Sequence, residues 1–246
     1  MDRIIYTAMT GAKNILDQQA TAAHNLANAS STGFRAQIDS FRAVPVVGGG
    51  LNTRAFVVNA TTGTDFTPGA IQQTGRSLDV AIQGKGWLAV QSTGGVEAYT
   101  RNGALKLSES GQLQTSSGKP VLGDSGPISI PPNLIIAIAA DGTISGTNDA
   151  SVPGSPNIIG RLKLTNPNEK NLVRGVDGLF VTADGKPAPA DAGVTLVNGA
   201  VESSNVNVVE GMVSMISLAR QFEVQMKLLT NAQDNDSKAT QIFSLP

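Results

Sequence analysis

Residues 205–240, NVNVVEGMVSMISLARQFEVQMKLLTNAQDNDSKAT, decide the fold of this chain. Apolar residues recur there at gaps of four and three, the spacing of a helix that packs along other helices. Asn205 or Asn207 can cap the first turn, and no proline interrupts the run. At a rise of about 1.5 Å per residue the predicted helix is roughly 50 Å long. Its predicted packing seam is Val208, Met212, Met215, Ala219, Phe222, Met226 and Leu229.

A second long helix is predicted at the other end of the chain, over residues 3–29. Its seam is rich in alanine, which allows close helix approach but contributes less burial energy per residue than bulkier side chains. The helix should stop near Asn28, because Asn, Ser and Thr side chains compete for backbone hydrogen bonds and Gly33 suits a left-handed turn. Phe34 follows as an apolar anchor. This predicted seam is Ile5, Ala8, Ala12, Ile15, Ala22 and Leu26.

The middle of the chain has a different period. From about Ser77 apolar residues alternate with polar ones, and glycine-containing turns such as Gly84-Lys85-Gly86 punctuate the pattern. This alternation is typical of antiparallel strands. The predicted strands cover residues 78–83, 87–91, 96–100, 105–107, 112–115, 128–130, 135–139, 158–165 and 179–182.

The sequence therefore predicts an α+β protein. Long N- and C-terminal helices should form a helical, coiled-coil-like rod domain, with a central antiparallel all-β domain between them. The predicted parts are an N-terminal rod-core helix (1–35), an extended connector (36–76), the central β domain (77–185), a return connector (186–204) and a C-terminal rod-core helix (205–246).

Composition narrows the function classes. The 246 residues are 40% hydrophobic, which suffices for a core, and 15% charged with a net charge of −1, which does not indicate nucleic-acid binding. The absence of cysteine excludes disulfides and thiolate chemistry. The N-terminal residues lack the apolar run of a cleavable secretory signal, and no stretch reaches transmembrane length, so we expect neither signal cleavage nor membrane insertion.

No catalytic, cofactor or metal site is predicted. His24 is the only histidine and falls on the N-terminal helix, where an interface position is the simpler interpretation. Asp234 and Asp236 lack the glycine and terminal glutamate of a calcium loop. The Gly84-Lys85-Gly86 turn precedes a strand and not a helix, so no helix N-terminus is available there to bind phosphate.

The terminal helices need helical neighbours. Burial of one large apolar side chain contributes about 1.5 to 3 kcal/mol, whereas ordering the backbone costs about 1 to 2 kcal/mol per residue before hydrogen bonds offset it. The pairing of the C-terminal helix, with its bulky seam, and the alanine-rich N-terminal helix is therefore only marginally stable by itself. We expect neighbouring subunits to cover the helices on more than one side.

Three motifs resemble those of one family. Residues 26–28 and 31–35, LAN and STGFR, resemble the N-terminal signature of the bacterial flagellar rod and hook proteins. Residues 79–87, DVAIQGKGW, resemble the central motif of that family, and residues 201–207, VESSNVN, its C-terminal one. The three motifs stand in the family's order and cover both ends and the middle. Within the family, chain length and the run MVSMISLARQFE at 212–223 are most similar to the proximal rod type.

The resemblance implies a structural subunit of the flagellar basal-body rod that transmits torque for motility. It implies assembly with other rod proteins and with copies of itself, and passage through the flagellar export apparatus without a cleaved signal peptide. The periplasm-spanning rod would be its location. The predicted assembly interface comprises the two seams together with Asn28, Gly33 and Phe34.

Two alternatives stay open at this point. The distal rod protein of the same family shares all three motifs. From a different class, a soluble β-rich enzyme such as a carbohydrate-active hydrolase would need paired carboxylates, for which Asp79, Glu97 and Asp124 are candidates. Their spacing singles out no pair, and aromatic residues for stacking on sugar rings are scarce.

Overall fold

The computed structural model describes residues 4–45, 55–132, 134–147 and 157–243, and the chain divides into two compact units. A helical unit contains Met1–Ala29, Ala36–Asp65 and Val206–Pro246, and a β unit contains Ser30–Arg35 and Phe66–Asn205. The α+β class is as predicted. Residues 1–3, 46–54, 133, 148–156 and 244–246, which fall in the predicted terminal helices, first connector and β domain, lie outside the described residues.

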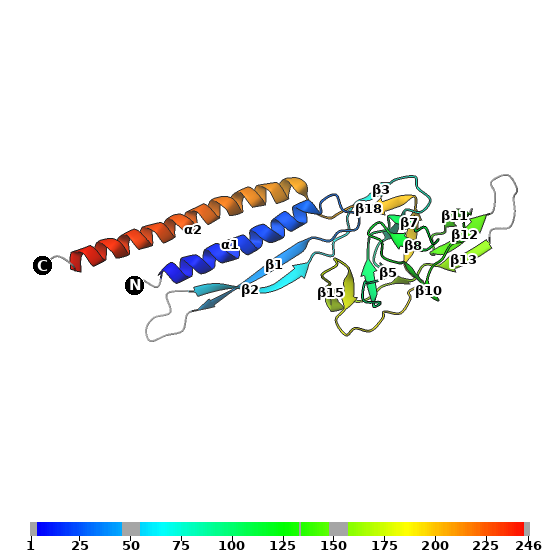
Figure 1. The fold of residues 1–246 in the computed structure, drawn as a ribbon, viewed down its shortest axis with the longest axis horizontal. Helices are drawn as coiled ribbons and strands as arrows, with labels where there is room; N and C mark the ends of the chain where they lie inside the picture. Colours follow the sequence, from blue (N-terminus) through cyan, green and yellow to red (C-terminus); the bar gives the residue numbers. More distant parts are fainter. Residues whose placement is uncertain (1–3, 46–54, 133, 148–156, 244–246) are drawn as a thin grey trace. The chain divides into compact units, whose positions relative to one another are not determined.

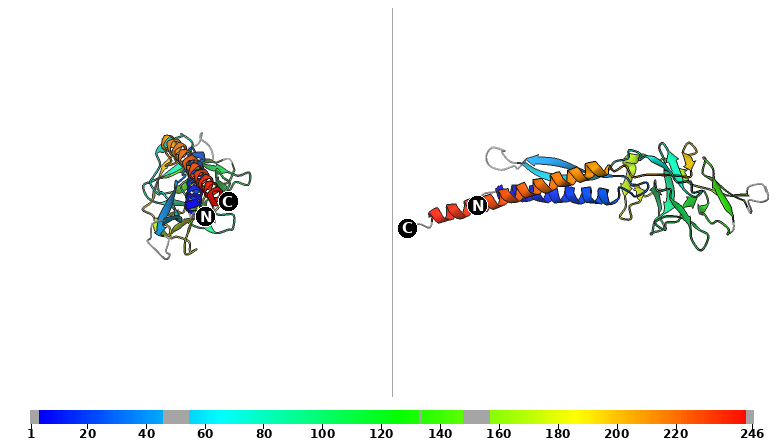
Figure 2. Two further views of the ribbon diagram at one scale, coloured as in Figure 1. Left: turned by 90° about the vertical axis from the view of Figure 1, so that its left-hand side faces the viewer. Right: turned by 90° about the horizontal axis from the view of Figure 1, so that it is seen from above.

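The helical unit is built on two long helices, α1 (Ile4–Ala27) and α2 (Val208–Phe243). They lie side by side (Figures 1 and 2) and run antiparallel, since Gly11 approaches Gln225 while Leu26 approaches Gly211. Asn207 caps α2 as predicted: its Oδ1 accepts hydrogen bonds from the backbone N–H groups of Val209 (3.1 Å) and Glu210 (3.3 Å). Over the described residues, neither helix is long and apolar enough to cross a membrane.

A long hairpin lies against α1 (Figure 1). Its strands β1 (Gln37–Pro45) and β2 (Ala55–Thr64) pair antiparallel. Asn14 donates from Nδ2 to the carbonyl of Val57 at 2.7 Å. Asn25 both donates to the carbonyl of Gln37 (2.9 Å) and accepts from its N–H (2.8 Å). Two asparagine amides of α1 therefore bind the backbone of this hairpin, which lies in the predicted extended connector; the short strand expected there at 55–58 is the start of β2.

The β unit is a set of short antiparallel strands and one 3-10 turn, η1 (Glu169–Asn171). The strands are β3 (Ile71–Gln73), β4 (Val80–Gln83), β5 (Trp87–Gln91), β6 (Glu97–Thr100), β7 (Leu105–Leu107), β8 (Leu113–Thr115), β9 (Leu122–Gly123), β10 (Gly126–Pro127), β11 (Ile135–Ile138), β12 (Thr143–Thr147), β13 (Asn157–Arg161), β14 (Leu164–Thr165), β15 (Leu172–Arg174), β16 (Phe180–Thr182), β17 (Thr195–Asn198) and β18 (Ala200–Glu202).

Strand pairing brings distant segments together. The five-stranded sheet has the order β14-β5-β6-β16-β15, and β11, β12 and β13 form a three-stranded sheet. β17 pairs with β4, and β18 pairs with β3. The predicted return connector 186–204 thus supplies two strands that close against residues before and at the start of the predicted β domain.

Strand β5 separates two apolar clusters. Because alternate side chains of a strand point to opposite faces, Leu88 and Val90 join the main core while Trp87 and Ala89 join a second, aromatic cluster. The aromatic cluster includes Phe180, whose ring centroid lies 4.9 Å from that of Trp87. Burial on both faces explains why this strand reads as a continuous apolar run and why its predicted bounds match the observed ones.

The β7–β8 hairpin offers a matched test of the main core. Leu107 and Leu113 stand opposite each other in the ladder, but Leu113 is fully buried and Leu107 is 39% exposed. We expect Leu113→Ala to lower the free energy of unfolding by about 2 to 5 kcal/mol, because it removes buried methyl groups and leaves a cavity. Leu107→Ala should cost about 0.5 kcal/mol or less. Equal losses in urea denaturation would show that the core does not extend over this hairpin.

Candidate assembly interface

The predicted seam of α1 faces inward. Tight packing of small residues agrees with the alanine-rich pattern. Ala8, Ala12 and Ile15 are buried in the helical unit. Ile5, Ala22 and Leu26 are half-buried.

The predicted seam of α2 is divided between two faces. Met215, Ala219, Phe222 and Leu229 are half-buried. Val208 (41% exposed), Met212 (50%) and Met226 (44%) are open to solvent. None of the side chains described on α2 is buried, so α1 covers this helix only partly.

A second apolar stripe on α2 was not predicted. It lies roughly opposite Gly211, Met215 and Leu218 at 3.6 residues per turn, and Arg220 interrupts it. We call it the outer stripe: Val209 (70% exposed), Val213 (62%), Ile216 (57%), Val224 (56%) and Leu228 (47%). The four-and-three spacing of apolar residues identifies only one face of the helix. Counting the apolar residues on every face of α2 would also have found the outer stripe.

The other predicted interface residues lie where α1 ends. Asn28 closes the helix by donating from Nδ2 to the carbonyl of His24 at 2.9 Å. Gly33 has a φ of 67° and donates its N–H to the carbonyl of Glu202 at 2.7 Å. A Cβ at Gly33 would stand 2.2 Å from the carbonyl carbon of Arg101, so only glycine fits. Gly33 and Phe34 belong to the β unit, whereas Asn28 belongs to the helical unit.

A buried ion cluster lies inside the β unit, beside Gly33. Glu202, 1% exposed, holds its Oε2 at 3.0 Å from Nη1 of Arg101 and its Oε1 at 2.6 Å from Nη1 of Arg35. Its Oε1 also accepts a hydrogen bond from the N–H of Gly69 at 2.9 Å. One carboxylate thus contacts three segments that are far apart in sequence. The sequence motifs contain Arg35 and Glu202, but the pairing of Glu202 with Arg35 and Arg101 was not predicted.

The cluster holds one more positive charge than negative. Arg101 also donates to the carbonyls of Ile82 (3.2 Å) and Gly84 (2.5 Å). Burial lowers the pKa of Arg101, and the charge of Glu202 opposes that change. Arg35 is less well served: among the described residues its guanidinium nitrogens have an ion-pair contact but no hydrogen bond of good geometry. Loss of the carboxylate would therefore leave two poorly compensated buried cations.

Arginines also stack on aromatic rings around the ion cluster. The guanidinium carbon of Arg174 lies 4.5 Å from the ring centroid of Phe34 and 5.4 Å from that of Phe180. Arg174 also donates from Nη1 to the carbonyl of Arg35 at 3.0 Å. Arg101 lies 5.6 Å from the Trp87 ring. These contacts fix the Ser30–Arg35 segment to the aromatic cluster.

Tyr99 forms a polar network within the aromatic cluster. Its hydroxyl accepts a hydrogen bond from the N–H of Ala188 (2.6 Å) and donates one to Glu97 (3.0 Å), which in turn pairs with Lys163 at 2.7 Å. Burial raises the pKa of Tyr99 to about 12, and the charge of Glu97 adds to the increase.

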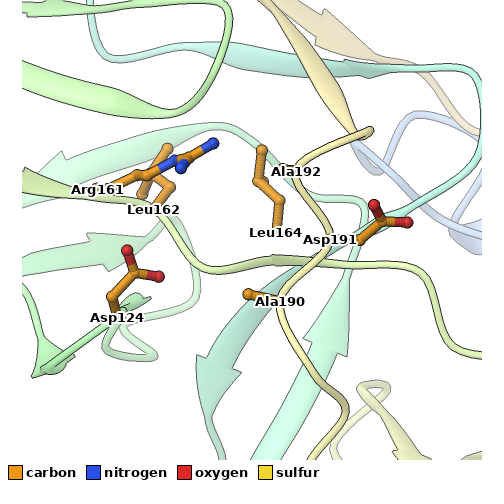
Figure 3. A pocket seen from close by; sticks show the side chains of 7 residues that line it. All are labelled: Asp124, Arg161, Leu162, Leu164, Ala190, Asp191 and Ala192. Carbon is orange, nitrogen blue, oxygen red and sulfur yellow. The ribbon is translucent and has the colours of Figure 1, made fainter.

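The carboxylates that the enzyme alternative needs are not gathered. Asp79 is buried beside Arg76 (3.2 Å), and Glu97 is engaged with Tyr99 and Lys163. Asp124 lines a pocket of about 150 Å³ with Arg161 and Asp191, where Figure 3 shows Asp124 and Asp191 on opposite sides of Leu164. This pocket is smaller than typical ligand sites of about 300 to 1,000 Å³. A second pocket lined by Asp124, of about 390 Å³, has no other carboxylate in its lining, and neither lining includes an aromatic residue.

The residues considered above for catalysis or for ion and phosphate binding lie apart from one another. No three His, Asp or Glu side chains in the described ranges are grouped as metal ligands. His24 lies exposed near the end of α1, and Asp234 and Asp236 lie in the last turns of α2. Gly84 and Gly86 form a turn between β4 and β5.

Known proteins match the whole chain. A family described as the flagellar hook protein FlgE/F/G D1 domain matches residues 81–146, and the flagellar basal body rod FlgEFG protein C-terminal family matches residues 197–242. The flagellar basal-body rod proteins FlgF of Salmonella typhimurium and Escherichia coli are each 47% identical over the full length of both chains. FlgG of Buchnera aphidicola subsp. Schizaphis graminum is 33% identical over 89% of this chain and 91% of its own.

Gly33 allows a direct test of close packing around the ion cluster. Gly33→Ala should lower the free energy of unfolding of the β unit, because the new Cβ meets the Arg101 backbone and the positive φ disfavours alanine. Gly75→Ala is the matched control: its φ is 72° but nothing lies within 4 Å of the added Cβ. The control should cost about 1 to 2 kcal/mol and Gly33→Ala clearly more, measured by urea unfolding with Trp87 fluorescence. Equal costs would contradict the close approach.

Tyr99 predicts a pH dependence of stability. Because the folded-state pKa is raised from 10 to about 12, the protonated hydroxyl stabilises the fold fully below pH 10, and this stability is lost as pH rises through about 12. Tyr99→Phe should lower stability at neutral pH by about 1 to 3 kcal/mol, since the Ala188 N–H loses its acceptor. The substitution should also remove the part of the stability loss at alkaline pH that ionisation of Tyr99 causes.

The matched control for that experiment is Tyr6→Phe, because Tyr6 is 59% exposed on α1. It should keep the native alkaline profile in urea unfolding. A Tyr99→Phe protein with that same profile would show that another group causes the loss.

Proposed function

The chain belongs to the FlgF family of flagellar basal-body rod proteins, and we propose that it is a proximal-rod subunit that polymerises through its terminal helices. Rod-subunit function follows from full-length identity to FlgF proteins. The proximal assignment is supported by higher identity to these FlgF relatives than to the matched FlgG. No geometry in the described residues favours the carbohydrate-active alternative.

The outer stripe is the observation that carries the assembly proposal. An isolated subunit leaves Val209, Val213 and Ile216 more than half exposed on a helix whose opposite side already meets α1. Burial of each such side chain is worth about 1.5 to 3 kcal/mol, so the cover of this stripe by neighbouring helices supplies a substantial driving force. A helix that is apolar on both sides is expected in the interior of a larger assembly.

The exposed side of α1 supports the same proposal. Tyr6 (59% exposed), Met9 (55%) and Leu16 (49%) recur at gaps of three and seven along this helix. They form a row at helical spacing that the hairpin and α2 leave open. Two such faces on one subunit allow each helical unit to contact more than one neighbour, as a tubular polymer requires.

The remaining parts of the proposal follow from the family. The terminal segments 1–35 and 205–246 would form the rod core, and residues 77–185 the domain outside it. Neighbours would be copies of this chain and other rod proteins in the basal body. Delivery through the flagellar export apparatus is also part of the proposal, on the strength of the family resemblance alone.

A charge in the outer stripe tests assembly separately from folding. Ile216→Glu should leave thermal unfolding of the purified subunit unchanged, because Ile216 is 57% exposed. In cells whose native gene is replaced by one for this variant, the protein should be missing from isolated basal bodies and the cells should not swim. The reason is that assembly would bury a carboxylate without a partner.

The control is Ser214→Glu, which adds the same charge to the same helix at an exposed polar position outside the outer stripe. It should swim normally. Normal swimming by the Ile216→Glu strain would remove the support for this face as an interface.

A further inference from the structure

The chain passes between the helical unit and the β unit at four points, after Ala29, Arg35, Asp65 and Asn205. On the side of the β unit these points belong to three segments, residues 30–35, 66–69 and 202–205, which we call the crossing segments. The polypeptide backbone carries force from the terminal helices of a subunit into the β unit through them. Their attachment inside the β unit therefore bears on how force passes along the chain.

One side chain contacts all three crossing segments. Glu202 belongs to the last, its Oε1 accepts from the N–H of Gly69 in the second, and the same oxygen pairs with Arg35 in the first. Its backbone carbonyl accepts the N–H of Gly33, again in the first. The other oxygen pairs with Arg101, which the main sheet region holds through the carbonyls of Ile82 and Gly84.

Further hydrogen bonds from Asn205 and Ser203 hold the last segment close to the first two. Asn205 donates from Nδ2 to the carbonyl of Thr67 at 3.1 Å, and its N–H lies 3.4 Å from the carbonyl of Phe34. Ser203 donates its N–H at 2.8 Å to the carbonyl of Ala70, the residue directly after the second segment. The Glu202 carboxylate is charged, buried to 1% exposure and in contact with both other segments.

We propose that Glu202 is the positioning residue that fixes the crossing segments to the β unit, so that load on the terminal helices is transmitted through its buried carboxylate. This inference rests on the proposed rod function for the load, but the attachment itself is a property of the single subunit. The apolar core of the β unit contributes its stability, whereas Glu202 holds the chain where it enters and leaves.

Amide hydrogen exchange on the full-length subunit tests the attachment. Glu202→Gln removes the counter-charge and turns one acceptor oxygen into an N–H donor that faces a guanidinium. We expect exchange of the Gly33, Gly69 and Ser203 amides to accelerate at least tenfold. The amides of Leu113 and Val121, which bond to Ile128 and Leu113 in the main core, should change less than twofold. A uniform acceleration, or none at the crossing segments, would overturn the proposal.

A second variant covers the case in which Glu202→Gln does not fold. Arg35→Met removes one buried cation and keeps the pairing of Glu202 with Arg101 and Gly69. Exchange should then accelerate at Gly33 and stay native at Gly69, a segment-specific result that general destabilisation would not produce. Acceleration at both amides would contradict the shared-carboxylate geometry. The matched control is Glu97→Gln, which breaks the ion pair with Lys163 without touching a crossing segment and should leave both amides unchanged.

Swimming under load tests the mechanical part. Cells with Glu202→Gln should contain native amounts of the protein in isolated basal bodies, yet their swimming speed should fall more steeply with medium viscosity than that of Glu97→Gln cells. Equal speeds at every viscosity, or loss of the protein from basal bodies, would overturn the load role. Absence of the native protein from basal bodies would instead refute the rod function, while the exchange result on the subunit would still stand.

Discussion

The burial of a glutamate between two arginines is the constraint on which the β unit depends. A carboxylate at 1% exposure is tolerated only because Arg35, Arg101 and the Gly69 amide meet it, and the arginines in turn need its charge. The closing strand β18 carries this residue, and its partner β3 begins two residues after Gly69. The chain ends of the β unit are thereby joined by electrostatics, while the strands between them are held by apolar burial.

The two units bury their apolar side chains to different extents. In the β unit, short strands cover both faces of β5, and Leu88 and Trp87 are almost completely removed from water. In the helical unit, α2 packs against α1, the other helix that the structure describes, and none of its described side chains is buried. A polymer subunit can combine a stable unit with an incompletely covered one, because contact with neighbours can supply the missing burial.

Glycine and asparagine place the segments that connect these parts. Gly33 permits the N-terminal segment to approach the Arg101 backbone in a left-handed conformation that a larger residue cannot adopt without a clash. Asn25 mimics a strand partner by bonding both backbone groups of Gln37 at the start of the hairpin. A few backbone and amide hydrogen bonds of this kind hold a segment of the chain in place without a large apolar contact.

The sequence by itself determined the features that depend on local periodicity. It predicted both terminal helices and strands such as Trp87–Gln91, because helix and strand periods repeat over several residues, and it offered Asn205 or Asn207 as the cap of the second helix. Only the tertiary structure decided which residues far apart in the chain meet. The hairpin on α1, the β18–β3 pair, the Arg35–Glu202–Arg101 cluster and the exposure of the outer stripe all depend on such partners. A charge or an apolar side chain in a sequence does not reveal whether folding covers it, since that depends on what the rest of the chain places opposite.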